Sequence, residues 1–165
     1  MTTHRRWGSH LPVLMKLFPL TSGVILELGT GIYSTPYLHW SCFLANRKLI
    51  SYESQEKYYE KARQYRNSRH RVRFAEDWDK LDIEGFFDII FIDIHPGSKR
   101  KNLAAKLKDS GLFIVLHDSE PTEDDCYKYS EIYPLFKYQY HYTKINPNTS
   151  VLSNFLDIGK VASAW

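Results

Sequence analysis

Five short apolar segments recur along the chain, and each is continuous rather than alternating with polar side chains. A strand that faces water on one side alternates apolar and polar residues, whereas a strand buried on both faces carries an unbroken apolar run. The pattern therefore predicts a parallel sheet that is covered on both faces. The predicted strands span residues 24–28, 48–52, 71–75, 87–92 and 112–116.

The segments between these runs have helical character. A helix is predicted over residues 34–46, because Ser34-Thr35-Pro36 combines a capping residue with a proline in the first turn. Residues 55–65 and 98–108 carry apolar side chains at helical spacing, and Gly111 follows the second segment as a helix stop. Strands that alternate with helices favour a doubly wound α/β sheet.

The last part of the chain has a different pattern. Residues 136–143 alternate with a period of two, residues 145–149 have turn composition, and residues 151–158 are another strand candidate. These features predict a β-hairpin at the edge of the sheet. We therefore expect an α/β, Rossmann-like doubly wound sheet of five parallel strands, closed by an antiparallel C-terminal hairpin to give seven strands.

Composition fits one domain. The 165 residues carry 22 basic and 19 acidic side chains, a net charge of +3 that gives little support to nucleic-acid binding. Cys42 and Cys126 have no metal-ligand spacing, which is typical of a reducing compartment, and no apolar run is long enough to span a membrane. We expect a single cytoplasmic domain with an N-terminal lid segment (1–21), a cofactor-binding core (22–120) and a C-terminal helix and hairpin (121–165).

The turn after the first strand carries the strongest functional signal. Gly29 and Gly31, with Thr30 between them, allow a tight turn and a close approach of the backbone to a ligand. Glu27 precedes the turn, and its charge disfavours a pyrophosphate but suits the cationic groups of S-adenosylmethionine (SAM). Glu53 ends the second strand, where a carboxylate can accept hydrogen bonds from both hydroxyls of a ribose.

Polar residues also follow the third, fourth and fifth strands. Asp77 could accept a hydrogen bond from an adenine amino group and Trp78 could stack on a ring, although an exposed turn explains both equally well. His95 and His117 lie at the carboxyl ends of strands, where ligands bind in such sheets. Either histidine could be a general base or an ordinary loop cap.

Together these segments resemble the class I SAM-dependent methyltransferases over residues 22–158, and the motifs at 91–95 and 117–118 resemble the catechol-type, small-molecule O-methyltransferase branch. The resemblance implies SAM as the cofactor and methyl transfer to a small or sugar-like acceptor. The candidate catalytic residues are Asp93 and Asp118, which the resemblance implies, together with His95 or His117 as the base. The implied cofactor-binding residues are Glu27, Gly29, Thr30 and Gly31 for the methionine part, Glu53 for the ribose, Asp77 and Trp78 for the adenine, and Asp93 beside the methyl group.

Asp93 and Asp118 also bear on metal binding. The two carboxylates could share a hard cation such as Mg²⁺ through oxygen ligands and water molecules. The metal-dependent members of the class usually follow the second aspartate with Asn, whereas Ser119 follows it here. A third ligand is therefore not identified, and no metal-ligand set is predicted.

Two segments could contact the acceptor. Lys99-Arg100-Lys101 lies at a predicted helix start and could hold an anionic acceptor, although such a basic cluster is more often a solvated surface. Residues 5–10 precede the sheet, and segments in this position often cover the cleft of this fold. Trp7 and His10 could then line the acceptor pocket.

Tyrosines are concentrated near the C-terminus, where six of the 12 lie between residues 127 and 142. Alternating tyrosines on an edge strand are ordinary amphipathic covering, but they could also form a homodimer surface. Two further functions stay open at this point. One is an NAD-linked or other nucleotide-dependent enzyme, which Glu27 and the replacement of the third fingerprint glycine by Ser34 disfavour; the other is a non-catalytic nucleotide-binding or nucleic-acid-associated module.

Overall fold

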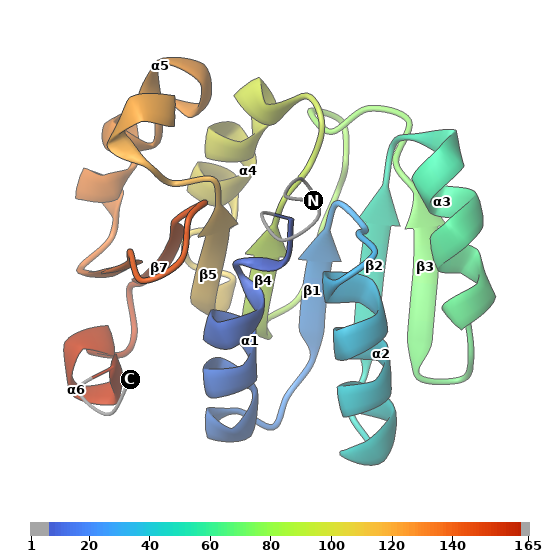
Figure 1. Ribbon diagram of the computed structural model, residues 1–165. Coiled ribbons are helices and arrows are strands. Elements are labelled where there is room, and N and C mark those ends of the chain that lie inside the picture. The colour runs from blue at the N-terminus through green and yellow to red at the C-terminus, as the bar shows by residue number, and fades with distance from the viewer. Residues whose placement is uncertain (1–6, 163–165) are drawn as a thin grey trace.

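The computed structural model describes residues 7–162, which form a seven-stranded sheet of order β3-β2-β1-β4-β5-β7-β6 (Figure 1). The first five strands are parallel, and β7 runs antiparallel to both of its neighbours. This arrangement confirms the predicted fold class. The strands are β1 (Ile25–Leu28), β2 (Leu49–Glu53), β3 (His70–Phe74), β4 (Phe87–Ile92), β5 (Gly111–His117), β6 (Tyr138–Tyr142) and β7 (Thr149–Ser153).

Helices cover both faces of the sheet, as the continuous apolar runs require. In Figure 1, α1 and α2 lie in front of the central strands. The helices are α1 (Leu11–Leu17), α2 (Ser34–Leu44), α3 (Glu56–Ala62), α4 (Arg100–Lys106), α5 (Asp124–Tyr127) and α6 (Ile158–Ala162). The three helices predicted between strands are confirmed, each somewhat shorter than expected.

Neighbouring residues of the central strands point to opposite faces of the sheet, which gives the molecule two apolar layers. Ile25 packs in the cluster that contains Leu14 of α1 and Leu38 of α2, whereas Leu26 packs in the cluster that contains Leu103 of α4. Both strand residues are fully buried. The sheet is therefore a rigid platform whose strand ends hold their side chains in fixed positions.

The strand order reverses between β1 and β4. From β1 the chain continues to β2 and β3 on one side, and from β4 it continues to β5 on the other. The crevice at the carboxyl ends of two such strands is where ligands bind in open α/β sheets. The strand order alone therefore predicts where the candidate site lies.

The N-terminal segment contributes more to the core than to a lid. Val13, Leu14 and Leu17 of α1 are fully buried, so this helix belongs to the apolar layer in front of the sheet. Residues 1–6 of the expected lid segment lie outside the described range. In residues 7–162, no helix combines the length and the apolar character that a membrane crossing requires.

The C-terminal helix expected before the hairpin is present only as a short element. Residues 121–137 instead form short 3₁₀ turns around the four-residue helix α5. Prolines at 121 and 134 cannot donate backbone hydrogen bonds, and Lys128 adopts a left-handed conformation with φ of 54°, which ends α5. These turns bring Tyr127 and Tyr129 toward the strand ends.

Two further boundaries differ from the prediction. β7 ends at Ser153 rather than at residue 158, because the Ser153 hydroxyl accepts hydrogen bonds from the backbone N–H groups of Phe155 and Leu156 and turns the chain. Gly111 does not end a helix but begins β5, where a side chain would collide with Ile90.

The tyrosines of the hairpin mainly cover the core. Tyr142 is buried, and Tyr138 and Tyr140 pack against the cluster in front of the sheet, whereas Gln139 and His141 between them are exposed. The period of two in the sequence therefore reflects an edge strand with one inward face, as predicted.

Candidate active site

A cavity of about 490 Å³ opens at the carboxyl ends of the central strands. Its volume lies in the range typical of small-molecule sites. The predicted site residues that line it are Thr30, Gly31, Glu53, Asp93, His95, His117 and Asp118, and Trp7 and His10 join them from the N-terminal segment. Residues predicted from four separate strand ends therefore meet around one space.

The glycine turn passes very close to the end of β4. Gly29 has φ of 88°, a conformation that favours glycine, and a Cβ atom there would overlap the backbone carbonyl group of Asp93. The backbone N–H of Gly31 donates to the Thr35 hydroxyl at 3.0 Å, which fixes the far side of the turn. Gly29 therefore supports the site by close packing rather than by lining the cavity.

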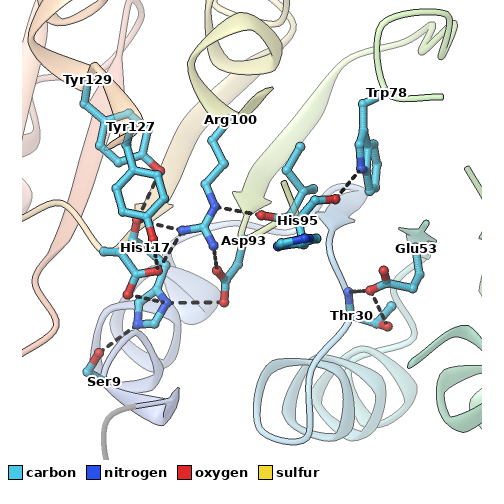
Figure 2. A network of polar contacts seen from close by, with 12 residues as sticks. Ser9, Thr30, Glu53, Trp78, Asp93, His95, Arg100, His117, Tyr127 and Tyr129 are labelled. Carbon is cyan, nitrogen blue, oxygen red and sulfur yellow. Dashed lines mark hydrogen bonds and ion pairs between the residues drawn. The ribbon is translucent and has the colours of Figure 1, made fainter. Parts of the chain in front are cut away.

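Glu53, the last residue of β2, is held at the cavity wall by hydrogen bonds to both carboxylate oxygens. Oε2 accepts from the backbone N–H and the hydroxyl of Thr30 at 2.8 and 3.0 Å, and Oε1 accepts from the backbone N–H groups of Ser54 and Gln55 at 2.8 Å each (Figure 2). These bonds link the glycine turn to the start of α3 through a single carboxylate.

Glu27 lies behind the turn rather than in the cavity. Its side chain is fully buried, and it accepts hydrogen bonds from the Thr35 hydroxyl at 2.9 Å and the Ser51 hydroxyl at 2.6 Å. Burial raises the pKa of Glu27 to about 7, against the opposing effect of these hydrogen bonds. The structure does not bring this residue into contact with the space where a ligand would lie.

The two residues expected near an adenine ring also lie away from the described cavity wall. The indole N–H of Trp78 donates to the Ser54 hydroxyl at 3.1 Å and to the His95 carbonyl at 3.0 Å, and its ring is buried in the core. Asp77 is partly exposed and pairs with Lys80 at 3.5 Å. Trp78 therefore anchors the loops after β2 and β4, while Gln55, Tyr58 and Ile94 line the cavity on this side.

The opposite wall is built by a ring of four charged or polar side chains, those of Asp93, Arg100, His117 and Asp118, of which Figure 2 labels the first three. Arg100, the first residue of α4, forms an ion pair with Asp93 Oδ1 at 2.6 Å and donates to Asp118 Oδ2 at 2.8 Å. His117 Nδ1 lies 3.2 Å from Asp93 Oδ2 and 3.4 Å from Asp118 Oδ1. The two aspartates therefore each face Arg100 with one oxygen and His117 with the other.

Electrostatics in this ring favour its charged state. Burial alone would raise the pKa of Asp93, but the charges of Arg100 and His117 outweigh it and hold the pKa below its ordinary value. Burial alone would lower the pKa of His117, but Asp93 and Asp118 outweigh it and raise the pKa. The pKa of Arg100 is raised by the same two carboxylates. Each group thus stabilises the ionised form of its neighbours.

Aromatic residues from the C-terminal turns support the ring. The guanidinium carbon of Arg100 lies 4.7 Å from the centre of the Tyr127 ring, a cation–π contact, and the Tyr127 hydroxyl donates to Asp118 at 3.3 Å. The Tyr129 hydroxyl donates to the His117 carbonyl at 3.1 Å. Sequence patterns did not identify these tyrosines as site residues, because they reach the site only through irregular turns.

The two aspartates do not fit a shared Mg²⁺ ion. Arg100 lies between them and pairs with one oxygen of each, while His117 faces the other two oxygens, so the two carboxylates do not converge on a position for Mg²⁺. The neighbouring basic residues turn outward, where Lys99 pairs with Asp79 and Lys101 pairs with Glu131. The expected anion-binding cluster is therefore divided, with one member built into the site and two on the surface.

The two candidate general bases have different surroundings. His95 is exposed at the cavity wall, two residues after Asp93. His117 is buried, and its Nε2 lies 2.9 Å from the hydroxyl of Ser9, at the end of the N-terminal segment. His95 is thus accessible to a molecule in the cavity, whereas His117 connects the N-terminal segment to the ring.

Comparison with solved structures gives the same fold. A methyltransferase from Pyrococcus furiosus aligns with a TM-score of 0.57 and 22% identity, covering 88% of this chain and 83% of its own. The O-methyltransferase from Bacillus cereus in complex with SAH aligns at 0.60 and 20%, covering 89% and 80%. The O-methyltransferase TomG from Streptomyces achromogenes, involved in tomaymycin synthesis and solved with SAM, aligns at 0.63 and 18%, covering 89% and 79%.

No family model matches the sequence, and no curated protein sequence matches it significantly. The structural likeness nevertheless extends over nearly the whole chain in each case. The chain therefore has the fold of the class I SAM-dependent methyltransferases, as the sequence motifs predicted.

Proposed function

We propose that the protein is a SAM-dependent methyltransferase that methylates an oxygen of a small or sugar-like acceptor. The observation that carries the proposal is the convergence of the glycine turn, Glu53 and Asp93 on one cavity at the point where the strand order reverses. Structural neighbours solved with SAM or SAH support this cofactor. The neighbours give no support to the NAD alternative.

Different residues of the cavity wall would bind the ribose, the methionine part and the adenine of SAM. Glu53 would accept the ribose hydroxyls, and the backbone of Thr30 and Gly31 would approach the methionine part. Gln55 and Ile94 line the cavity next to Glu53 and would hold the adenine in place of the two residues expected from the sequence. Asp93 lines the same cavity and would lie beside the methyl group of the cofactor.

Methyl transfer requires an acceptor oxygen that attacks the methyl carbon in line with the departing sulfur while it loses its proton. His95 is proposed as the group that takes this proton, because it is the exposed histidine at the cavity wall and imidazole accepts protons near neutral pH. Asp93 would orient the acceptor, since its carboxylate is held in place by Arg100 and faces the cavity.

Calorimetric titration with SAM, SAH and NAD tests the proposal directly. We expect SAM and SAH to bind and NAD not to bind. Glu53→Ala should weaken SAM binding at least tenfold, because the carboxylate positions the glycine turn and accepts the ribose hydroxyls. The exposed Glu60→Ala is the matched control and should bind normally. If neither SAM nor SAH binds the native protein, the proposal is wrong.

Two finer features are also proposed. Both described cysteines are free, with Cys42 buried and Cys126 exposed, which supports a reducing compartment such as the cytoplasm. A homodimer through the tyrosine-rich region stays a prediction. The position of β6 at the edge of the sheet supports it, because an edge strand offers unpaired backbone groups to a second chain.

A further inference from the structure

We propose that His10, Asp93 and His117 bind a divalent transition-metal ion, such as Zn²⁺, in the wall of the cavity. One nitrogen or oxygen atom from each residue lies within 4.8 Å of the others. His10 comes from the N-terminal segment, Asp93 follows β4 and His117 ends β5, so only the folded chain assembles the site. The site is distinct from the Asp93–Asp118 pair considered from the sequence.

The geometry of two ligand atoms already suits a tetrahedral ion. His117 Nδ1 and Asp93 Oδ2 are 3.2 Å apart. Ligand atoms bound at about 2.0–2.1 Å in a tetrahedral zinc site lie roughly 3.3 Å from one another. The rings of His10 and His117 meet edge-on with 4.8 Å between their centres, and a nitrogen of His10 lies within 4.8 Å of the other two ligand atoms.

The unpartnered nitrogen atoms of buried His10 support a bound ion. The His10 side chain is only 2% exposed, yet neither of its ring nitrogens has a hydrogen-bond partner among the described residues. His117 Nδ1 lies 3.2 Å from Asp93 Oδ2, and a metal ion would displace the proton between this nitrogen and the carboxylate. Buried polar atoms almost always have partners, and a metal ion would supply one for a His10 nitrogen while it also binds His117.

Neighbouring side chains orient two of the proposed ligands, as residues that hydrogen-bond to metal ligands do in metalloproteins. Ser9 lies against His117 Nε2 at 2.9 Å, leaving Nδ1 to face the ion, and Arg100 binds Asp93 Oδ1, leaving Oδ2. Two imidazoles and one carboxylate favour zinc or another transition metal over Mg²⁺, which prefers oxygen ligands. All three ligands line the cavity, so a fourth position would be open to a water molecule or an acceptor oxygen.

Metal binding by the purified protein, stripped with EDTA and dialysed, tests this site without any need for methyl transfer. Calorimetry with Zn²⁺ should show one equivalent bound, and Co²⁺ should give the visible absorption of a tetrahedral site. His10→Phe should weaken binding by about 100-fold or more, since it removes a ligand while preserving a ring of similar shape against Phe91. His95→Ala is the matched control, because this histidine lines the same cavity and should leave the affinity unchanged.

The folded state of each variant is checked by circular dichroism and thermal melting. His10→Phe should fold, because the nitrogens that it removes have no described partner. The native protein should also melt at a higher temperature when Zn²⁺ is added, and folded His10→Phe should not. Absence of binding to the native protein, undiminished binding to His10→Phe, or an equal loss in His95→Ala would each overturn the proposal.

Discussion

Residues of the same type have different roles in this protein, because their surroundings differ. Glu27 and Glu53 both end or nearly end a strand, yet one is enclosed by hydroxyl groups and the other is held by backbone N–H groups at the cavity wall. Arg100 and its neighbours in sequence show the same contrast, because only Arg100 turns inward to two carboxylates. Burial and hydrogen bonding therefore decide which charged residue is structural and which faces a ligand.

Glu27 should make stability depend on pH. Its pKa of about 7 in the folded protein lies above the ordinary value of 4.5, so the folded state binds the proton more tightly than the unfolded state. The stabilising contribution is fully present below about pH 4.5 and is lost as the pH rises through 7. Glu27→Gln keeps the neutral form and should therefore be more stable than the native protein at pH 8, by on the order of 3 kcal/mol.

Urea unfolding of both proteins between pH 5 and pH 8 measures this difference. The gap in unfolding free energy should widen as the pH rises. Glu84→Gln, at an exposed position, should leave the pH profile unchanged. A constant gap across this range would show that Glu27 is ionised throughout.

At the scale of elements, the site depends on how closely the loops at the strand ends approach one another. The glycine turn after β1 presses on the backbone that follows β4, and Trp78 ties the loop after β2 to the same backbone. These contacts join elements from distant parts of the sequence. The position of the cavity wall therefore depends on these contacts between loops.

Gly29→Ala should be strongly destabilising, because it combines an unfavourable backbone conformation with an overlap against the Asp93 carbonyl. We expect a loss of at least about 2 kcal/mol in the free energy of unfolding. Gly85→Ala separates the two effects, since Gly85 also has a positive φ but a Cβ atom there would meet nothing closer than 4.0 Å.

Denaturant titration of the two glycine variants supplies the comparison. The Gly85 variant should lose only about 1 kcal/mol, the cost of the left-handed conformation alone. Equal losses of unfolding free energy in both variants would mean that the close approach of the turn to β4 does not affect stability. In that case the close contact could not be what positions the cavity wall.

For the whole molecule, Arg100 is the central connection on one side of the cavity. It joins α4 to the residues after β4 and β5, and the Tyr127 ring brings α5 onto the same group. Removal of one member of a buried charged cluster leaves its partners without compensation, which costs far more than the loss of a surface ion pair. The stability of the fold and the shape of the site are therefore coupled through this residue.

Arg100→Leu should lower the free energy of unfolding by about 3–5 kcal/mol, because the half-buried Asp93 and Asp118 would lose the buried cation that pairs with both. Lys101→Ala removes the neighbouring surface pair with Glu131 and should cost at most about 1 kcal/mol. Chemical unfolding monitored by tryptophan fluorescence gives both values. Similar losses for the two variants would contradict a central role for Arg100.

By itself, the sequence determined the fold class and the strand ends that carry the site. Unbroken apolar runs and the glycine turn depend on local periodicity and backbone freedom, which are visible in a single chain. Only the tertiary structure decided that Glu27 and Trp78 point away from the cavity, that Arg100 joins two aspartates, and that His10 meets His117. The reason is physical: side-chain direction, burial and pairing depend on contacts between residues far apart in sequence, and no local pattern records those contacts.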